Sequence, residues 1–341
     1  MGSFSGFSRG LSAAWGRCWE PLSGSQAEYR STLLGRDLVS CRDLSLREVS
    51  EIFSLANQLV RGELRLDSAL AGKKVALLFT EPSTRTFQSF YMAAKTLGAE
   101  VMSISDPSVS SMAKGESLYD TVKMLELYGA GCIVLRHPAR GAAKFAAESA
   151  SIPIINAGSG SQEHPTQALI DVFTIWRKRG SVDGLRIGML GDLRYSRTIP
   201  SLCQLLSLYR GVEIYFMAPQ ILQVRREVEI YLQENGVTFA KIDESEEMKG
   251  VLPRLDVLYV TRIQKERFPD PTEYEKVRGS YVVDASTLSN CRSDIGIMHP
   301  LPRVDELSPE IDSTPNAWYF EQAGYGVPIR TALLYLIMGG K

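Results

Sequence analysis

The chain has 341 residues, of which 44% are hydrophobic, 9% aromatic and 23% charged, a composition typical of folded globular proteins. This balance excludes collagen-like, disulfide-scaffold and wholly disordered chains, and the length allows two domains with separate cores. The 38 Lys and Arg residues nearly balance the 39 Asp and Glu residues, and a net charge of −1 gives no basic field for nonspecific nucleic-acid binding.

The first 30 residues predict an N-terminal extension that is either disordered or a targeting segment. Residues 1–19 contain Arg9, Arg17, several Ser and Gly residues and no acidic residue, which is faintly similar to a transit peptide. We expect a cytoplasmic protein, or a plastid or mitochondrial one if this segment is a transit peptide. No run approaches the ~18 apolar residues of a membrane-spanning helix, so we expect no membrane contact.

The cysteines are spread along the chain without a C-x-x-C pair or a Cys/His cluster. They therefore favour the reduced structural thiols of an intracellular protein over a disulfide framework or a zinc site. The cysteines are Cys18, Cys41, Cys132, Cys203 and Cys291.

From about residue 44, helix-period segments alternate with short apolar runs, the pattern of α/β units on parallel sheets. The strands of this first series are predicted at 75–79, 101–105, 132–136 and 152–155. Its helices are predicted at 45–59, from Thr84 to a stop at Gly98, before Gly129, at 140–149 and at 165–179.

A second series predicts strands at 186–190, 213–217, 257–260, 281–283 and 296–298. The boundary falls near the Gly180-Ser181 turn, with the preceding helix as connector, and 317–338 predicts an apolar helix that packs back on the first domain. We therefore expect an α/β chain of two doubly wound domains, each with a mainly parallel sheet flanked by helices. The expected domains are 31–180, completed by the C-terminal helix, and 181–316.

Polar side chains follow the predicted strands at the points where each strand ends. In open parallel sheets, ligands bind beyond these carboxyl ends. Each residue alone would fit a cap or a surface ion pair, but together they form a converging set of guanidiniums, hydroxyls and imidazoles with few carboxylates. The set comprises Glu81, Ser83, Thr84, Arg85, Thr86, Arg136, His137, His164, Asp192, Arg197, Arg262, Gln264, Lys265, Arg267 and the segment from His299 to Arg303.

The residues from Ser83 to Thr86 open a predicted helix directly after a buried strand. Backbone N–H groups, hydroxyls and the Arg85 guanidinium then lie at the positive end of a helix dipole. This arrangement favours a phosphate site over a plain Ser/Thr cap. The loop 110–116 also precedes a helix and carries Lys114, for which phosphate contact and a solvated turn are equal alternatives.

Signatures of several other enzyme classes are missing from the sequence. There is no G-x-x-x-x-G-K-[ST] and no G-x-G-x-x-G between a strand and a helix, which argues against P-loop nucleotidases and dinucleotide dehydrogenases. H-E-x-x-H and G-x-S-x-G are also missing, so we expect no metal, no cofactor and no serine nucleophile.

Seven collinear motifs between about residues 32 and 338 resemble the catalytic chains of the aspartate/ornithine carbamoyltransferase family. Thr166 and Pro300 favour the aspartate branch, because they stand where ornithine enzymes typically carry other residues. Thr80, Phe87, Ser196 and Tyr325 depart from the usual residues of the family. The motifs are F-T-E-P-S-T-R-T from Phe79, K-G-E-S from Lys114, R-H-P from Arg136, H-P-T-Q-A-L from His164, G-D-L from Gly191 with Arg197-Thr198, T-R-I-Q-K-E-R from Thr261 and H-P-L-P-R from His299.

The resemblance implies transfer of a carbamoyl group from carbamoyl phosphate to L-aspartate in pyrimidine synthesis. Four of the residues it implies would be catalytic, namely Arg85, Thr86, Arg136 and His164. The phosphate would be held by Ser83, Thr84, Arg85, Thr86 and Arg136. The carbonyl oxygen would face Thr86, Arg136 and His164, and the carbamoyl nitrogen would face Gln167.

The resemblance also implies an acceptor site. Arg197 would bind the α-carboxylate of aspartate, and Arg262 with Gln264 its side-chain carboxylate. The carbonyls of Pro300 and Leu301 would receive NH groups. Glu81 would pair with Arg197 and Arg267 and orient them.

In this family the active site lies between subunits of a homotrimer, so Ser111 and Lys114 would come from a neighbouring chain. A regulatory subunit and other pyrimidine enzymes are conceivable further partners. Two alternatives stay open: a carbamoyltransferase for another amine such as ornithine, whose cationic tail would face Arg262, and a non-catalytic regulatory homologue.

Overall fold

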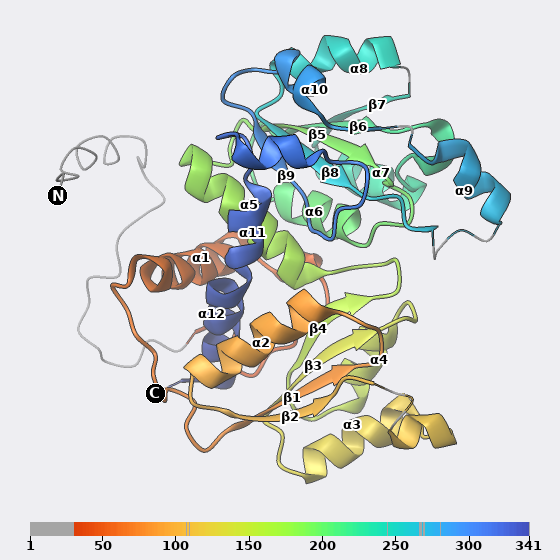
Figure 1. The fold of residues 1–341 in the computed structure, drawn as a ribbon. Coiled ribbons are helices and arrows are strands. Elements are labelled where there is room, and N and C mark those ends of the chain that lie inside the picture. Colours follow the sequence, from red (N-terminus) through yellow and green to blue (C-terminus); the bar gives the residue numbers. More distant parts are fainter. Residues whose placement is uncertain are drawn as a thin grey trace.

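The computed structural model describes residues 31–340 except positions 107, 109, 244, 266, 267, 269 and 280. The predicted N-terminal extension and Arg267, expected to pair with Glu81, lie outside the described residues. Figure 1 shows two α/β domains, one above the other, with α5 (Pro165–Arg179) and α11 (Tyr319–Gly324) where they meet.

The N-terminal domain contains a four-stranded parallel sheet with the order β2-β1-β3-β4. Its central strand shows how both faces are covered. Val75, Leu77 and Phe79 share a hydrophobic cluster with the helices at 46–61, 84–96 and 326–338, and Ala76 and Leu78 share another with those at 118–127 and 142–149. Burial on both faces explains the near-continuous apolar runs of β1 and β3. The strands are β1 (Lys74–Phe79), β2 (Glu100–Ile104), β3 (Cys132–His137) and β4 (Ile154–Ser159).

The C-terminal domain contains a five-stranded parallel sheet with the order β7-β6-β5-β8-β9. In each sheet the carboxyl ends of the strands lie on one edge, and this edge carries the polar residues that the sequence places after the strands. The strands are β5 (Arg186–Gly191), β6 (Glu213–Met217), β7 (Thr238–Ile242), β8 (Val257–Thr261) and β9 (Gly296–Met298).

Some helix ends carry the sequence signals expected of them. α1, for example, starts after Ser45, which forms a capping box with Glu48, and ends at Gly62 in the left-handed conformation. α12 packs against α1 and α2 of the N-terminal domain. The remaining helices are α1 (Leu46–Arg61), α2 (Thr84–Thr96), α3 (Leu118–Leu127), α4 (Ala142–Ser149), α6 (Thr198–Leu206), α7 (Arg226–Glu234), α8 (Ser245–Val251), α9 (Pro271–Val277), α10 (Ala285–Ser289) and α12 (Gly326–Met338).

Some of the sequence-based element predictions were wrong. The segment 281–283 is not a strand, because only Val283 is buried and it makes a single bridge, to Leu307. The fifth strand of the C-terminal sheet is β7, which the sequence hid because it is an edge strand with mostly exposed side chains. The predicted helix at 317–338 is two helices, α11 and α12, separated at Tyr325.

Candidate active site

A cavity of about 570 Å³ lies where the two domains meet, beyond the carboxyl ends of β1, β3, β5, β8 and β9. Twelve of the fourteen residues predicted for the site line this one cavity, although they come from distant parts of the sequence. They are Ser83, Thr84, Arg85, Thr86, Arg136, His164, Gln167, Arg197, Arg262, Gln264, Pro300 and Leu301.

One wall of the cavity is the start of α2. Ser83 occupies the N-cap position with extended backbone, and within the described residues its side chain makes no capping hydrogen bond. Ser83 is thus the N-cap by position but not through its hydroxyl, and it lines the cavity. Arg85 follows at the positive end of the helix dipole, where the α2 backbone N–H groups also point outward. This wall has the features of a phosphate site.

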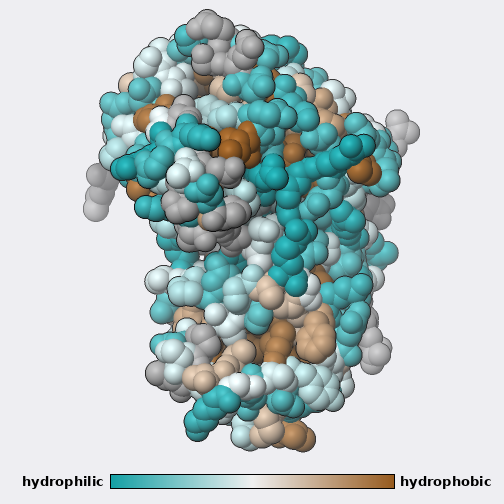
Figure 2. Space-filling model, turned by 90° about the vertical axis from the view of Figure 1, so that its right-hand side faces the viewer, coloured by the Kyte–Doolittle hydropathy of each residue, from teal (hydrophilic) through white to brown (hydrophobic). Residues whose placement is uncertain are grey.

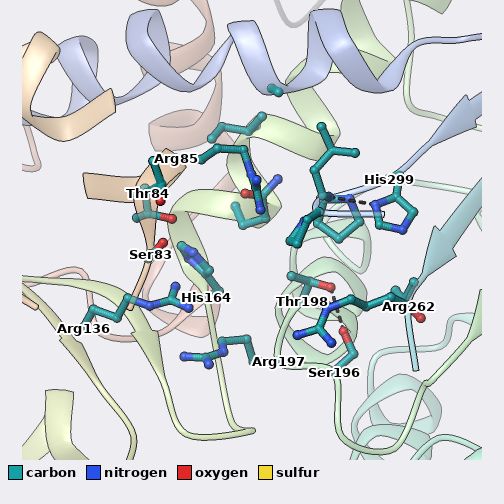
Figure 3. A pocket seen from close by; sticks show the side chains of 18 of the residues that line it. Ser83, Thr84, Arg85, Arg136, His164, Ser196, Arg197, Thr198, Arg262 and His299 are labelled. Atoms are coloured by element: carbon teal, nitrogen blue, oxygen red, sulfur yellow. Dashed lines mark hydrogen bonds between the residues drawn. The ribbon is translucent and has the colours of Figure 1, made fainter. Parts of the chain in front are cut away.

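Arg85 faces a second cation across the cavity. Partial burial lowers the pKa of Arg85, and the positive charge of Arg262 lowers it further. Arg262 follows β8 in the C-terminal domain, so the two domains present guanidiniums to each other (Figure 3). An anion placed between them would relieve this repulsion, which is a physical reason to expect a ligand with several negative charges.

Glu81 is the carboxylate that balances two further arginines. Nη1 of Arg197 donates to Oε2 of Glu81 at 2.9 Å and Nη2 donates to Oε1, while Nη2 of Arg136 lies 3.6 Å from Oε1. The predicted Glu81–Arg197 pair is confirmed. A Cβ on Gly158 would lie 2.9 Å from Nη1 of Arg197 and 3.0 Å from Nη1 of Arg136, so a glycine is needed where the guanidiniums meet.

His164 lies between these arginines at the start of α5, with only 4% of its surface exposed. Its backbone N–H donates to Oγ of Ser201 at 2.8 Å, whereas Nδ1 has no hydrogen-bond partner among the described residues. Burial lowers the pKa of His164 well below its usual value, and the charges of Arg136, Arg330 and Arg197 act in the same direction. The imidazole is therefore neutral at physiological pH and can serve as a hydrogen-bond donor rather than a cation.

A buried carboxylate, that of Asp192, holds the C-terminal wall together. Oδ2 of Asp192 accepts from the backbone N–H of Gln264 at 3.2 Å, and Oδ1 accepts from that of Tyr195 at 2.8 Å. Asp192 is fully buried after β5, and it thereby connects the loop that carries Arg197 with the loop that carries Arg262. One acceptor thus fixes the backbone of both loops.

The segment after β9 presents backbone carbonyls. Nδ1 of His299 accepts from the Leu301 N–H at 2.8 Å, and Nε2 of His299 donates to Oε1 of Glu306 at 2.8 Å. Leu301 has a φ of 55°, a left-handed conformation that few side chains other than glycine adopt easily. Its N–H is used by His299, so Pro300 and Leu301 bring acceptors to the cavity.

Several lining residues were not predicted from the sequence. Arg330 on α12 is buried, donates to Ser89 and to Oγ1 of Thr166 at 3.3 Å, and its guanidinium lies 4.9 Å from the Phe90 ring centroid. Burial lowers the pKa of Arg330 to about 9. An arginine in an apolar C-terminal helix was the available signal, because a buried charge needs a reason. Gln322 of α11 also lines the cavity.

The structure does not bring Ser111 and Lys114 to this cavity. They lie in an exposed 3₁₀ turn, Ser111–Lys114, and do not line it. His137, also considered from the sequence, accepts from the Ala139 N–H at 3.0 Å and lies outside the lining.

The four departures from family residues have ordinary contacts. Phe87 stacks edge-on against Phe79 at 5.3 Å, and Tyr325 against Phe173 at 5.2 Å. Oγ1 of Thr80 donates to the Arg136 carbonyl at 3.2 Å. Ser196 alone lines the cavity, where its hydroxyl lies 3.0 Å from that of Thr198.

Two absences apply to the described residues only. No group of three or more His, Cys, Asp and Glu side chains among them is arranged to hold a metal ion. None of the helices described is both long enough and apolar enough to span a membrane.

Comparisons with known proteins agree with this geometry. A model of the carbamoyl-P binding domain of aspartate/ornithine carbamoyltransferases matches residues 36–177, and a model of the Asp/Orn binding domain matches residues 183–337. The chain is 50% identical over 310 residues to the aspartate carbamoyltransferase catalytic subunit of Thermococcus onnurineus (strain NA1), which covers 89% of this chain and 97% of that protein.

Solved structures are similar over the same range. Aspartate transcarbamoylase from Trypanosoma cruzi in complex with carbamoyl phosphate and aspartate superposes with a TM-score of 0.84 at 36% identity, covering 90% of this chain and 98% of that one. The catalytic subunit of M. jannaschii aspartate transcarbamoylase gives a TM-score of 0.78 at 46% identity, covering 88% and 96%.

Proposed function

The chain belongs to the aspartate/ornithine carbamoyltransferase family, and we propose that it transfers the carbamoyl group of carbamoyl phosphate to L-aspartate, releasing phosphate. The product, N-carbamoyl-L-aspartate, serves pyrimidine synthesis. The observation that carries this proposal is the cavity itself, where opposed arginines of both domains face one another beside a neutral, buried histidine. Both substrates are polyanions and suit such a site.

The N-terminal wall would bind the phosphate. The hydroxyls of Ser83, Thr84 and Thr86, the α2 backbone N–H groups and the guanidiniums of Arg85 and Arg136 provide donors from one helix start and one strand end. Because phosphate is already a good leaving group, positioning and charge neutralisation are the main catalytic needs. Without a nucleophilic dyad, the amine of aspartate attacks the carbamoyl carbon directly.

Attack of the amine creates a tetrahedral intermediate with a negatively charged oxygen. Thr86, Arg136 and His164 would donate to that oxygen, and preplaced donors of this kind usually make the largest single contribution to catalysis. As the tetrahedral intermediate collapses, the C–O bond breaks, phosphate departs with its electron pair, and the amine proton passes to a phosphate oxygen. Neutral His164 would take part as an N–H donor.

The C-terminal wall would bind aspartate. Arg197 would contact the α-carboxylate, and Arg262 with Gln264 the side-chain carboxylate, while the carbonyls of Pro300 and Leu301 accept from NH groups. Glu81 holds Arg197 through both guanidinium nitrogens and thereby orients it. Ornithine would bring an ammonium group to Arg262, which disfavours it as acceptor.

We also propose that the chain acts as a homotrimer in which Ser111 and Lys114 reach the active site of a neighbouring chain. Both residues are exposed and do not line the cavity of their own chain. Hydrophobic side chains gather on the surface of the lower, N-terminal domain in Figure 2. The exposed apolar side chains of this domain include Met92 at 49% and Leu127 at 78% exposure, which a second copy would cover.

Mixing inactive variants tests the shared site. Lys114→Ala and Arg262→Ala chains, each inactive alone, should regain activity when their subunits exchange, because some interfaces then combine two intact halves. If subunit exchange is demonstrated and activity stays absent, Lys114 does not act across an interface.

The reaction itself is tested by carbamoyl transfer from carbamoyl phosphate to L-aspartate and, in parallel, to L-ornithine. We expect turnover with aspartate alone. Turnover with ornithine would refute the acceptor assignment, and phosphate binding without turnover on either acceptor would favour the regulatory homologue.

A further inference from the structure

The buried carboxylate of Asp171 connects both domains behind the cavity. Asp171 lies on α5 and is fully buried. Its Oδ1 accepts from Nε2 of Gln167 at 2.8 Å and from Nε2 of Gln322 at 2.7 Å, and its Oδ2 accepts from the Tyr259 hydroxyl at 2.8 Å. Gln322 belongs to α11 and Tyr259 to β8, so three elements meet at one acceptor.

The first consequence concerns the orientation of the Gln167 amide. A carboxylate only accepts hydrogen bonds, so it can hold this amide only through the NH₂ group. The amide oxygen of Gln167 is then free to act as an acceptor in the cavity, which Gln167 lines. The NH₂ of a carbamoyl group is a donor and requires such an acceptor. With the amide reversed, two NH₂ groups would face each other.

The second consequence concerns the segment after β9. Gln322 also gives its NH₂ to Asp171, so its oxygen accepts from the His299 backbone N–H at 2.9 Å. His299 in turn accepts from the Leu301 N–H at 2.8 Å. The left-handed backbone of Leu301 is costly and needs surrounding contacts to persist. Asp171 is therefore two hydrogen bonds away from the backbone that carries the Pro300 and Leu301 carbonyls.

We propose that Asp171 is a positioning residue for carbamoyl transfer, which fixes the amide orientations of Gln167 and Gln322 and so aims acceptor oxygens from both domains at the substrate NH groups. The inference rests on the proposed function and adds a residue to it. Asp171 touches no substrate in this account. Its effect passes through Gln167 on the carbamoyl side and through Gln322 and His299 on the aspartate side.

Two substitutions at this position separate positioning from charge. Asp171→Asn keeps an oxygen for both glutamines, while its NH₂ donates to the Tyr259 oxygen, since a phenol oxygen also accepts. Asp171→Leu has a similar volume and removes the acceptor. Tyr259→Phe is the matched control, because it removes a buried partner of the same carboxylate without freeing either glutamine.

The test measures kcat, the KM for aspartate and the Kd for inorganic phosphate. For Asp171→Leu we expect kcat to fall by about 30-fold or more with the phosphate Kd within about threefold, because only the acceptor geometry changes. Asp171→Asn and Tyr259→Phe should stay within about threefold of the unsubstituted enzyme in kcat. The proposal would be overturned if the Asp171→Leu variant binds phosphate and keeps the kcat of the unsubstituted enzyme. It would also be overturned if the Asp171→Asn variant loses as much kcat as the Asp171→Leu variant.

If Asp171→Leu does not fold, Gln322→Leu tests the aspartate side alone. We expect its KM for aspartate to rise by about tenfold with phosphate binding unchanged, and an unchanged KM would overturn this arm. Absence of transfer by the unsubstituted enzyme would instead refute the proposed function, so the two failures are distinguishable.

Discussion

The two sides of the cavity are built in different ways. On the N-terminal side, most of the proposed phosphate ligands come from one stretch, Ser83 to Thr86, at the start of α2. On the C-terminal side the residues come from separate strand ends and are held by carboxylates from other segments, as Arg197 is by the partly exposed Glu81 and Gln264 by the buried Asp192. In the proposed function, phosphate recognition is therefore local, whereas acceptor recognition depends on contacts between distant parts of the chain. Substitutions should separate the two.

We expect the Arg262→Ala substitution to give the largest difference between the effects on aspartate and on phosphate. We predict that kcat/KM for aspartate falls by about 10²–10³-fold, because a charge-assisted contact of about 3–4 kcal/mol is lost. Inorganic phosphate should bind within about threefold of the unsubstituted protein, since the α2 start is intact. Steady-state kinetics and calorimetry measure both, with Arg254→Ala, an exposed arginine of the same domain, as control. An equal loss of phosphate affinity would show that the two sides are not separable.

His164 sits between the two sides and should affect the chemical step. We predict that His164→Gln lowers kcat by about 10²-fold, because the proposed donor to the developing oxyanion is displaced. Burial and three arginines hold the pKa of His164 well below its usual value, which favours the neutral ring. The kcat profile of the unsubstituted enzyme should therefore show no limb from this ring near pH 6.5. If kcat changed with pH near 6.5 in the unsubstituted enzyme and this change were lost in the His164→Gln variant, the neutral state of the ring would be contradicted.

Asp171 should affect stability as well as positioning. Burial raises the pKa of Asp171 from 3.8 to about 6, so between these values the folded protein binds more protons at this site than the unfolded chain. Its contribution to stability therefore falls as pH rises through that window, by up to about 3 kcal/mol. We predict that Asp171→Asn gains stability relative to the unsubstituted protein between pH 4 and pH 7, measured by urea unfolding. A difference that is independent of pH would contradict the raised pKa.

The Glu81→Gln substitution should weaken aspartate binding and strengthen phosphate binding. Arg197 loses its oriented partner, so the KM for aspartate should rise by about tenfold. Arg136, 3.6 Å from the same carboxylate, is freed of a competing charge, so inorganic phosphate should bind about threefold more tightly. Glu227→Gln, which affects surface pairs with Arg140 and Arg225, is the control. Parallel weakening of both ligands would show that Glu81 does not separate the sides.

The same contrast explains what could be predicted from the sequence. The start of α2 could be predicted because the hydroxyls, Arg85 and the signal for the helix start are contiguous in the sequence. The parallel sheets could be predicted from the apolar runs of their strands. Gln322 and Asp171 are 151 positions apart, and Arg330 and Ser89 are 241 positions apart, so no local pattern joins them. β7 was missed because an edge strand needs little apolar surface, and the run at 281–283 was apolar without a sheet edge to join.

Competition between acceptors in one reaction tests the central claim most directly. Isotope-labelled carbamoyl phosphate is supplied with equal concentrations of L-aspartate and L-ornithine, without added metal, and the products are identified by mass spectrometry. We expect labelled N-carbamoyl-L-aspartate as the dominant product. Label found chiefly in citrulline, the product of ornithine, would contradict the assignment of Arg262 and Gln264 to a carboxylate.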